Sequence, residues 1–144
     1  MTSVLLDTGP LVAFLKRDDG HHAWAVAAFA ATRPPLRTCE AVVTEACYLL
    51  RSWRGGPETV LELVERRIVM VDFRLEDDAA AIRTLIAKYG SRVMDLADAC
   101  LVRMAERRPR TSVLTVDTQF RHVYRKNGRQ VIPTILPPTK RAKP

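Results

Sequence analysis

The stretch that decides the fold lies near the N-terminus and reads Val4-Leu5-Leu6-Asp7-Thr8-Gly9-Pro10-Leu11. It opens with a run of Val and Leu without polar alternation, which is typical of a strand buried on both faces of a parallel sheet. The run stops at Asp7, and Pro10 suits the first turn of a helix, where no backbone N–H is needed. The stretch therefore predicts a strand, a sharp turn at Asp7 and a helix directly after it.

Asp7 has two interpretations. A lone Asp before a helix most often serves only as its cap. Open α/β sheets, however, bind their ligands at the carboxyl ends of the strands, which is where Asp7 would lie. If Thr8 is the N-cap of the helix instead, the carboxylate of Asp7 is free to face a ligand. We expect this second arrangement because other acids of the chain fall in comparable places.

The rest of the chain alternates short apolar runs with segments of helical periodicity. We expect strands at 4–6, 36–39, 68–71 and 112–116, with an edge strand at 131–132. We expect helices at 11–15, 21–32, 41–53, 57–64, 77–88 and 95–107, and a basic loop or short helix at 121–129. Strands separated by helices imply βαβ units. The prediction is one α/β domain over residues 1–138, with a parallel sheet and helices on both faces.

Composition excludes several classes of protein. The 144 residues suffice for one domain with a sizeable core. No apolar run approaches the length of a membrane span, and Asp7 interrupts the N-terminus too early for a secretory signal, so we expect a cytoplasmic protein without a membrane partner. The three cysteines form no CxxC pair, so we expect buried thiols and no disulfide framework or zinc site.

The chain is basic. It has 23 Lys and Arg against 16 Asp and Glu, a net charge of +7. Three of these charges lie in the tail 139–144, which we expect to be disordered. The remaining +4 favours a polyanionic partner, although charge alone does not establish nucleic-acid binding.

Several acids occupy unusual places. Asp117 repeats the setting of Asp7, since each follows an apolar strand and precedes a Thr. In a parallel sheet both would lie at one edge, and close together if their strands are neighbours. Glu45 and Asp98 are each surrounded by apolar residues. Asp95 and Asp98 share one face of a first helical turn, where the dipole favours negative charge; capping explains Asp95 well and Asp98 tolerably, but leaves Glu45 unexplained.

Clustered carboxylates repel one another, and burial raises their pKa values unless a cation compensates. Hard divalent ions are suited to such oxygen ligands, and the lack of His or Cys beside the acids favours Mg²⁺ or Mn²⁺ over zinc. On a basic protein this chemistry suggests phosphodiester hydrolysis by metal-activated water. Basic residues after Asp117 are candidates for holding the substrate backbone, although each also fits a solvated surface. They are Arg121, Arg125, Lys126 and Arg129.

The order and setting of these acids resemble the acidic motifs of PIN-domain ribonucleases, most closely the VapC-type toxins of bacterial toxin–antitoxin pairs. The matching stretches are Leu5-Leu6-Asp7-Thr8-Gly9-Pro10-Leu11, Thr44-Glu45-Ala46, Asp95-Leu96-Ala97-Asp98-Ala99-Cys100-Leu101 and Thr115-Val116-Asp117-Thr118-Gln119-Phe120. Each stretch is weak alone, but the four occur in the right order at compatible intervals. They span nearly the whole chain up to its Pro-rich end.

The resemblance implies a three-layer α/β/α sandwich around a parallel sheet of four or five strands. It implies Mg²⁺- or Mn²⁺-dependent endonucleolytic cleavage of RNA, commonly tRNA or another translation-related RNA. Asp7 and Asp98 would be the principal metal ligands, and Glu45 and Asp117 would complete the catalytic cluster and help place the water.

Two further residues take minor roles in this resemblance. Thr115 would hydrogen-bond a neighbouring acid and so orient it. Asp95 would cap its helix first and serve as an auxiliary acid second.

The resemblance also implies a homodimer and a small antitoxin protein that blocks the acidic groove. Trp24, Phe29 and Trp53 are candidates for such contacts, although core packing is the more common use of such residues. Two alternatives stay open: a PIN nuclease of RNA maturation or decay without an antitoxin, and a non-catalytic RNA- or protein-binding module on the same fold. The four acids argue against the module. A phosphatase of the haloacid dehalogenase type is disfavoured because it needs an Asp at position 9, which is Gly.

Overall fold

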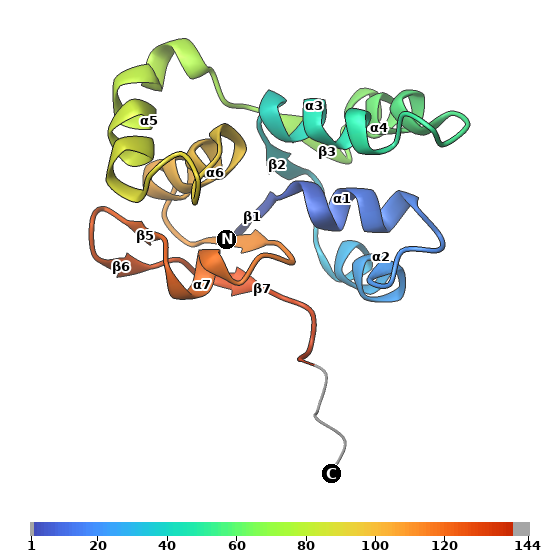
Figure 1. The fold of residues 1–144 in the computed structure, drawn as a ribbon. Coiled ribbons are helices and arrows are strands. Elements are labelled where there is room, and N and C mark those ends of the chain that lie inside the picture. Colours follow the sequence, from blue (N-terminus) through green and yellow to red (C-terminus); the bar gives the residue numbers. More distant parts are fainter. Residues whose placement is uncertain (1, 140–144) are drawn as a thin grey trace.

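A computed structural model describes residues 2–139 of the chain. Five parallel strands form the central sheet in the order β3-β2-β1-β4-β7 (Figure 1). Their bounds are β1 Ser3–Leu6, β2 Leu36–Thr38, β3 Val69–Val71, β4 Thr111–Leu114 and β7 Thr134–Ile135. The predicted parallel sheet is therefore confirmed. The tail that was predicted to be disordered lies outside the described residues from residue 140 onward.

Helices cover both faces of the sheet. They are α1 Thr8–Leu15, α2 His22–Ala31, α3 Glu40–Leu49, α4 Gly56–Glu65, α5 Leu75–Tyr89, α6 Leu96–Arg107 and α7 Gln119–His122. In Figure 1 the sheet lies between α5 and α6 on one side and α1 and α2 on the other, which confirms the three-layer α/β/α sandwich. Within residues 2–139, no helix combines the length and the apolar character that a membrane crossing requires.

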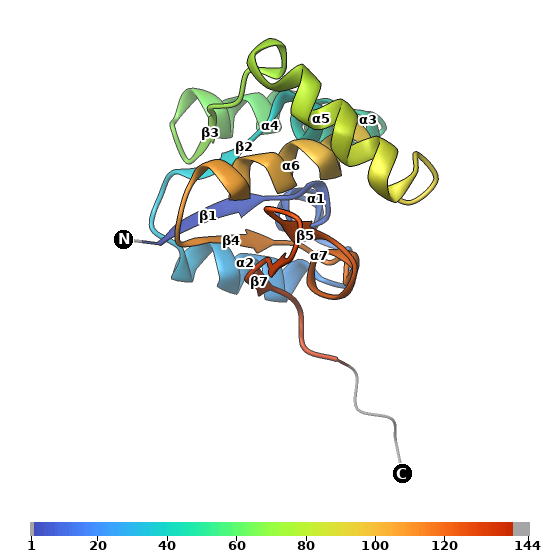
Figure 2. The ribbon, with the colours of Figure 1, turned by 90° about the vertical axis from the view of Figure 1, so that its left-hand side faces the viewer.

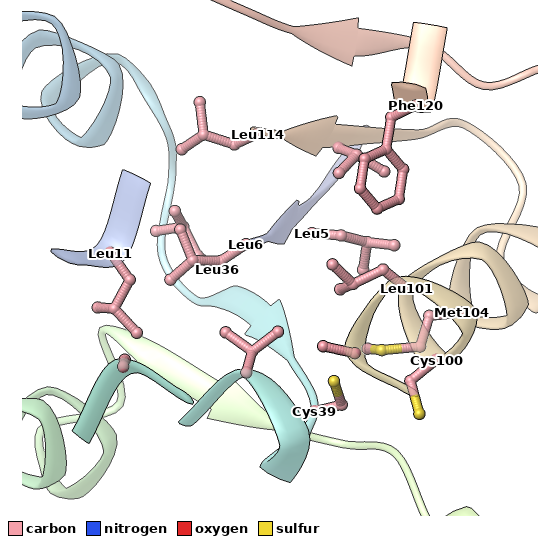
Figure 3. Close-up of a cluster of buried hydrophobic side chains, with 14 of the residues drawn as sticks. Leu5, Leu6, Leu11, Leu36, Cys39, Cys100, Leu101, Met104, Leu114 and Phe120 are labelled. Carbon is pink, nitrogen blue, oxygen red and sulfur yellow. The ribbon is translucent and has the colours of Figure 1, made fainter. Parts of the chain in front are cut away.

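The core is built around β1, whose alternating side chains supply both layers. Leu5 lies near Leu101 of α6, while Leu6 lies beside Leu36 on the side of α1 (Figure 3). These side chains are almost fully buried, and each such Leu contributes about 1.5–3 kcal/mol to folding. The three cysteines are free thiols: Cys39 and Cys100 are buried in this core and Cys47 is partly buried.

The strand register decides where the acids emerge. β1 pairs in parallel with β4, with Leu6 opposite Leu114, and β2 lies on the other side of β1. The two strands therefore end at the same level of the sheet. In Figure 2 their arrowheads point toward the beginning of α1 and toward α7. The expected neighbourhood of Asp7 and Asp117 follows from this pairing.

Residues 119–135 differ from the sequence prediction. In place of a basic loop or one short helix, α7 ends at His122 and an antiparallel hairpin of β5 (Arg125–Lys126) and β6 (Gln130–Val131) follows. Asn127 and Gly128 in its turn have φ values of 53° and 80°, a conformation that Asn and Gly adopt readily. The edge strand predicted at 131–132 is therefore wrong, because β6 takes Val131 and β7 forms the edge.

The predicted helix 41–53 is also too long, since α3 ends at Leu49 and a turn leads to α4. This turn needs glycine at position 56. A Cβ atom on Gly56 would lie 2.4 Å from the carbonyl oxygen of Leu50, and a backbone atom cannot move aside as a side chain can.

We expect Gly56→Ala to lower the free energy of unfolding by about 1–3 kcal/mol, the usual cost of overpacking, as measured by urea denaturation. Gly20→Ala is the matched control, because no atom lies within 4 Å of its added Cβ, and it should change the stability by less than about 0.5 kcal/mol. Equal stabilities of the two variants would contradict the packing argument.

Candidate active site

Asp7 lies at the end of β1 and is only 8% exposed. Its Oδ1 accepts a hydrogen bond from the backbone N–H of Thr8 at 2.8 Å, and its Oδ2 accepts one from the hydroxyl of Thr115 at 2.6 Å. Asp7 is therefore the N-cap of α1. The prediction that Thr8 is the cap was wrong, because the chain enters the helix one residue earlier and Thr8 is already helical.

The hydroxyl of Thr8 has a different partner. It donates to Oε2 of Glu45 at 2.9 Å, which connects the start of α1 with α3. Glu45 itself is exposed, although the helix around it is apolar. The sequence offered no capping role for Glu45. It lies at the surface beside Asp7, at the edge of the sheet where β1 ends.

Thr115 links the two acids that follow neighbouring strands. Its hydroxyl donates to Asp7 and accepts a hydrogen bond from the backbone N–H of Asp117 at 2.9 Å. Asp117 in turn accepts from the backbone N–H of Gln119 at 2.9 Å, at the start of α7. The predicted hydrogen bond from Thr115 to a neighbouring acid is present; its role beside a metal ion stays a prediction.

Gly9 lets α1 approach the segment that carries Asp117. A Cβ atom on Gly9 would lie 2.5 Å from Cγ2 of Val116, the residue directly before Asp117. The first turn of α1 therefore packs closely against the segment just after β4, and this contact explains glycine at position 9 without reference to catalysis.

Asp95 and Asp98 lie at the start of α6. Asp95 is the N-cap and accepts from the backbone N–H of Asp98 at 2.8 Å, so the structure contains the capping contact predicted for Asp95. Asp98 is partly buried, and its Oδ2 lies 2.8 Å from the hydroxyl of Tyr124. Its carboxylate therefore has a partner of its own and takes no part in the cap.

The pKa values show that these acids form one cluster. Burial raises the pKa of Asp7 to about 6; hydrogen bonds from Thr115 and Thr8 oppose the rise, while the charges of Glu45 and Asp117 add to it. Glu45 and Asp117 are thus close enough to Asp7 to disfavour its ionisation.

Asp98 behaves in the same way. Burial raises its pKa to about 7, and the charges of Asp95, Asp7 and Asp117 contribute, against the hydrogen bond from Tyr124. Carboxylates from the end of β1, from α3, from α6 and from the segment after β4 therefore share one electrostatic environment.

A buried acid elsewhere in the chain shows what this cluster lacks. Asp78 of α5 is 5% exposed, but Arg103 and Arg107 hydrogen-bond it at 2.9 and 2.7 Å. Burial alone would raise its pKa, yet the two arginines lower it. No salt bridge between described residues involves Asp7, Glu45, Asp98 or Asp117. The cluster therefore has no comparable cation in the described part of the chain.

The cluster offers carboxylate oxygens, the kind of donor atom that binds a hard divalent cation. Within residues 2–139, no group of three or more His, Cys, Asp and Glu side chains is already arranged to bind a metal ion. The available ligands are nevertheless carboxylate oxygens, which Mg²⁺ and Mn²⁺ prefer. Each oxygen of Asp7 accepts one hydrogen bond and so keeps a lone pair for another contact. The residues present therefore fit such an ion.

Comparison with known proteins agrees with this chemistry. The PIN domain family matches residues 4–126, a range that contains all the acids of the cluster. The chain belongs to the PIN domain family. PIN domains are generally nucleases and generally use divalent metal ions.

The fold of this PIN domain is similar to a solved structure. The crystal structure of DNA-bound VapBC from Salmonella typhimurium aligns with a TM-score of 0.54 and 21% sequence identity, over 94% of this chain and 98% of that chain. No curated protein matches the chain closely enough to count as a relative.

The four basic side chains predicted to bind RNA lie after Asp117 in this PIN domain. Arg121 and Arg129 are exposed, while Arg125 and Lys126 are partly buried. The guanidinium of Arg125 donates to the backbone carbonyls of Arg121 and Tyr124, and that of Arg121 donates to the hydroxyl of Thr134. Two of the four side chains are thus engaged within the protein.

The aromatic residues considered for partner contacts pack inward. Phe29 is buried and stacks on Phe14, and Trp24 and Trp53 are partly buried against the core. Core packing therefore accounts for all three candidates.

Tyr124 is the site residue that sequence reasoning missed. The prediction placed it in a basic loop or short helix, but it is fully buried beside the acids. Its spacing of four residues from Phe120 was the available signal for a shared buried face, and the two rings do pack edge-on, although Tyr124 lies beyond the end of α7.

The raised pKa values predict that the metal-free protein loses stability as the pH rises. The unfolded chain releases these protons near the ordinary Asp value of 3.8, whereas folded Asp7 and Asp98 keep them to about 6 and about 7. Between these values the folded state binds more protons, so the free energy of unfolding falls with pH. In EDTA we expect a lower melting temperature at about pH 7.5 than at about pH 5.

Asp98→Asn should flatten this pH dependence, because it removes one of the two groups, while Asp18→Asn at an exposed position should preserve it. Added Mn²⁺ should stabilise the wild-type protein more as the pH rises, since ligands must be ionised to bind. Identical pH dependences in wild type and Asp98→Asn would show that Asp98 is not one of the groups responsible for the loss of stability.

Proposed function

We propose that this PIN domain is a Mg²⁺- or Mn²⁺-dependent endoribonuclease that hydrolyses phosphodiester bonds. The observation that carries the proposal is the cluster of acids from separate parts of the chain, two of them with raised pKa values and none with a cationic partner among the described residues. The net charge of +7 supports a polyanionic substrate.

In this proposal the residues of the site have different roles. Asp7 and Asp98, the two acids with raised pKa values, would hold the ion. Glu45 and Asp117 would complete the cluster and help position the attacking water. A bound divalent ion would supply an activated water and neutralise charge developing on the phosphate. Thr115 would keep Asp7 in orientation through its hydrogen bond.

Asp95 has a smaller part, because its carboxylate already caps α6 through the N–H of Asp98. It would act as an auxiliary acid whose charge adds to the cluster.

The substrate backbone would lie along α7 and the β5–β6 hairpin, which follow Asp117 directly in the chain. Phosphate contacts depend on positive charge more than on shape. We propose the basic residues of this segment for them: Arg121, Arg125, Lys126 and Arg129.

We expect Asp7→Asn, Asp98→Asn and Asp117→Asn each to reduce Mg²⁺-dependent RNA cleavage by at least about 10²-fold, in line with the loss of one strong electrostatic contact to a transition state. Single-turnover cleavage of a labelled RNA measures the rate, and circular dichroism verifies folding. Asp18→Asn makes the same charge change at the surface and should cleave like wild type. Undiminished cleavage by folded Asp7→Asn and Asp98→Asn would refute the assignment.

We further propose that the protein is the toxin of a type II toxin–antitoxin pair, acting in the cytoplasm on tRNA or another translation-related RNA. Two observations support this: the acidic motifs resemble those of VapC-type toxins, and the fold is similar to that of a DNA-bound VapBC complex. The cognate antitoxin and a second copy of the chain would then be its protein partners.

Expression of the wild-type protein in a bacterial host should arrest growth, and Asp98→Asn should relieve the arrest because it removes cleavage. Sequencing of RNA 5′ ends after brief induction should reveal new ends at defined sites in the target RNA, absent with Asp98→Asn. Normal growth with active enzyme present would instead favour a nuclease of RNA maturation or decay.

A further inference from the structure

The hydroxyl of Tyr124 lies at a junction of three segments around the acidic cluster. It is 2.8 Å from the backbone carbonyl of Val93, 2.8 Å from Oδ2 of Asp98 and 2.8 Å from Oε1 of Gln119. These atoms belong to the loop before α6, to α6 and to α7. The ring is fully buried, with Tyr89 and Phe120 packed edge-on against it.

Proton counting assigns the donor role at this junction. A phenol has one proton to donate, while a backbone carbonyl and an ionised carboxylate can only accept. The side-chain amide of Gln119 can turn so that its NH₂ group donates to the phenol oxygen. Hydrogen bonds to a charged acceptor are the stronger ones, so the phenol proton goes to Asp98 when Asp98 is ionised.

We propose that Tyr124 is a positioning residue for the metal-binding carboxylate of Asp98. Its hydrogen bond restrains Oδ2 and leaves the other carboxylate oxygen to bind the ion. Tyr124 also reaches Asp117 indirectly, because Gln119 contacts the phenol with its side chain and Asp117 with its backbone N–H. One hydroxyl thus fixes the relative positions of two acids. This inference rests on the proposed metal-dependent function.

A purely structural role for Tyr124 is the competing explanation, and Tyr124→Phe separates the two because it keeps the ring. Tyr89→Phe is the matched control. Tyr89 packs against the same ring, and its hydroxyl accepts from the backbone N–H of Arg125. That contact involves no carboxylate, so a loss confined to Tyr124→Phe reports on Asp98.

The test measures Mn²⁺ binding by titration calorimetry, together with the Mn²⁺ concentration that gives half-maximal RNA cleavage. We expect Tyr124→Phe to weaken Mn²⁺ affinity about 10- to 100-fold, as is usual when a partner of a metal ligand is removed. The rate at saturating Mn²⁺ should fall far less, and Tyr89→Phe should bind like wild type.

Unchanged Mn²⁺ affinity in Tyr124→Phe, with binding lost in Asp98→Asn, would overturn this inference and leave the proposed nuclease intact. Equal losses in both tyrosine variants would also overturn it. Absence of Mn²⁺ binding by the wild type would overturn both proposals. If Tyr124→Phe does not fold, Gln119→Ala at its partly exposed position replaces it, with an expected loss of about fivefold, the equivalent of one hydrogen bond; no loss would count against the inference.

Discussion

The parallel pairing of β1 with β4 is the constraint on which the site depends. With Leu6 opposite Leu114, the two chains leave the sheet at one level, and the hydroxyl of Thr115 can contact Asp7 while it receives the N–H of Asp117. A shift of one residue in this register would turn every side chain of β1 to the other face of the sheet. The positions of Asp7 and Asp117 are thus secured by two paired strands of the core, while α3 and α6 supply Glu45 and Asp98.

The molecule deals with buried negative charge in two different ways. Asp78 is neutralised permanently by two arginines of α6, and this contact fastens α5 to α6. The acids at the end of β1 and the start of α6 receive hydrogen bonds but no arginine or lysine from the described residues. Their mutual repulsion opposes folding, and the packed core tolerates it. Such a local loss of stability is typical of a functional site, where the groups needed for reactivity are not the ones that would stabilise the fold most.

Much of the fold and the identity of the acids could be predicted because they depend on local patterns. Apolar runs indicated the inner strands, and the rule that parallel strands end at one edge brought Asp7 and Asp117 together. The first residue of the helix after Asp7 could not be predicted to within one position, because Asp7 and Thr8 are both good N-cap residues. The strands of 125–135 are too short to show periodicity. The contact of Tyr124 with Asp98 joins segments distant in sequence, which no local pattern encodes.

Asp7 belongs both to the helix and to the acidic cluster, since its Oδ1 caps α1 and its carboxylate lies close enough to Asp98 to affect the pKa of that residue. A descendant of this chain that lost the proposed nuclease activity would still be under pressure to keep an aspartate or asparagine there for the helix. Aspartate at this position is therefore poor evidence that a related sequence is an active enzyme. Glu45 and Asp98 cap no helix, so their presence or loss is the better guide when active and inactive relatives are to be told apart.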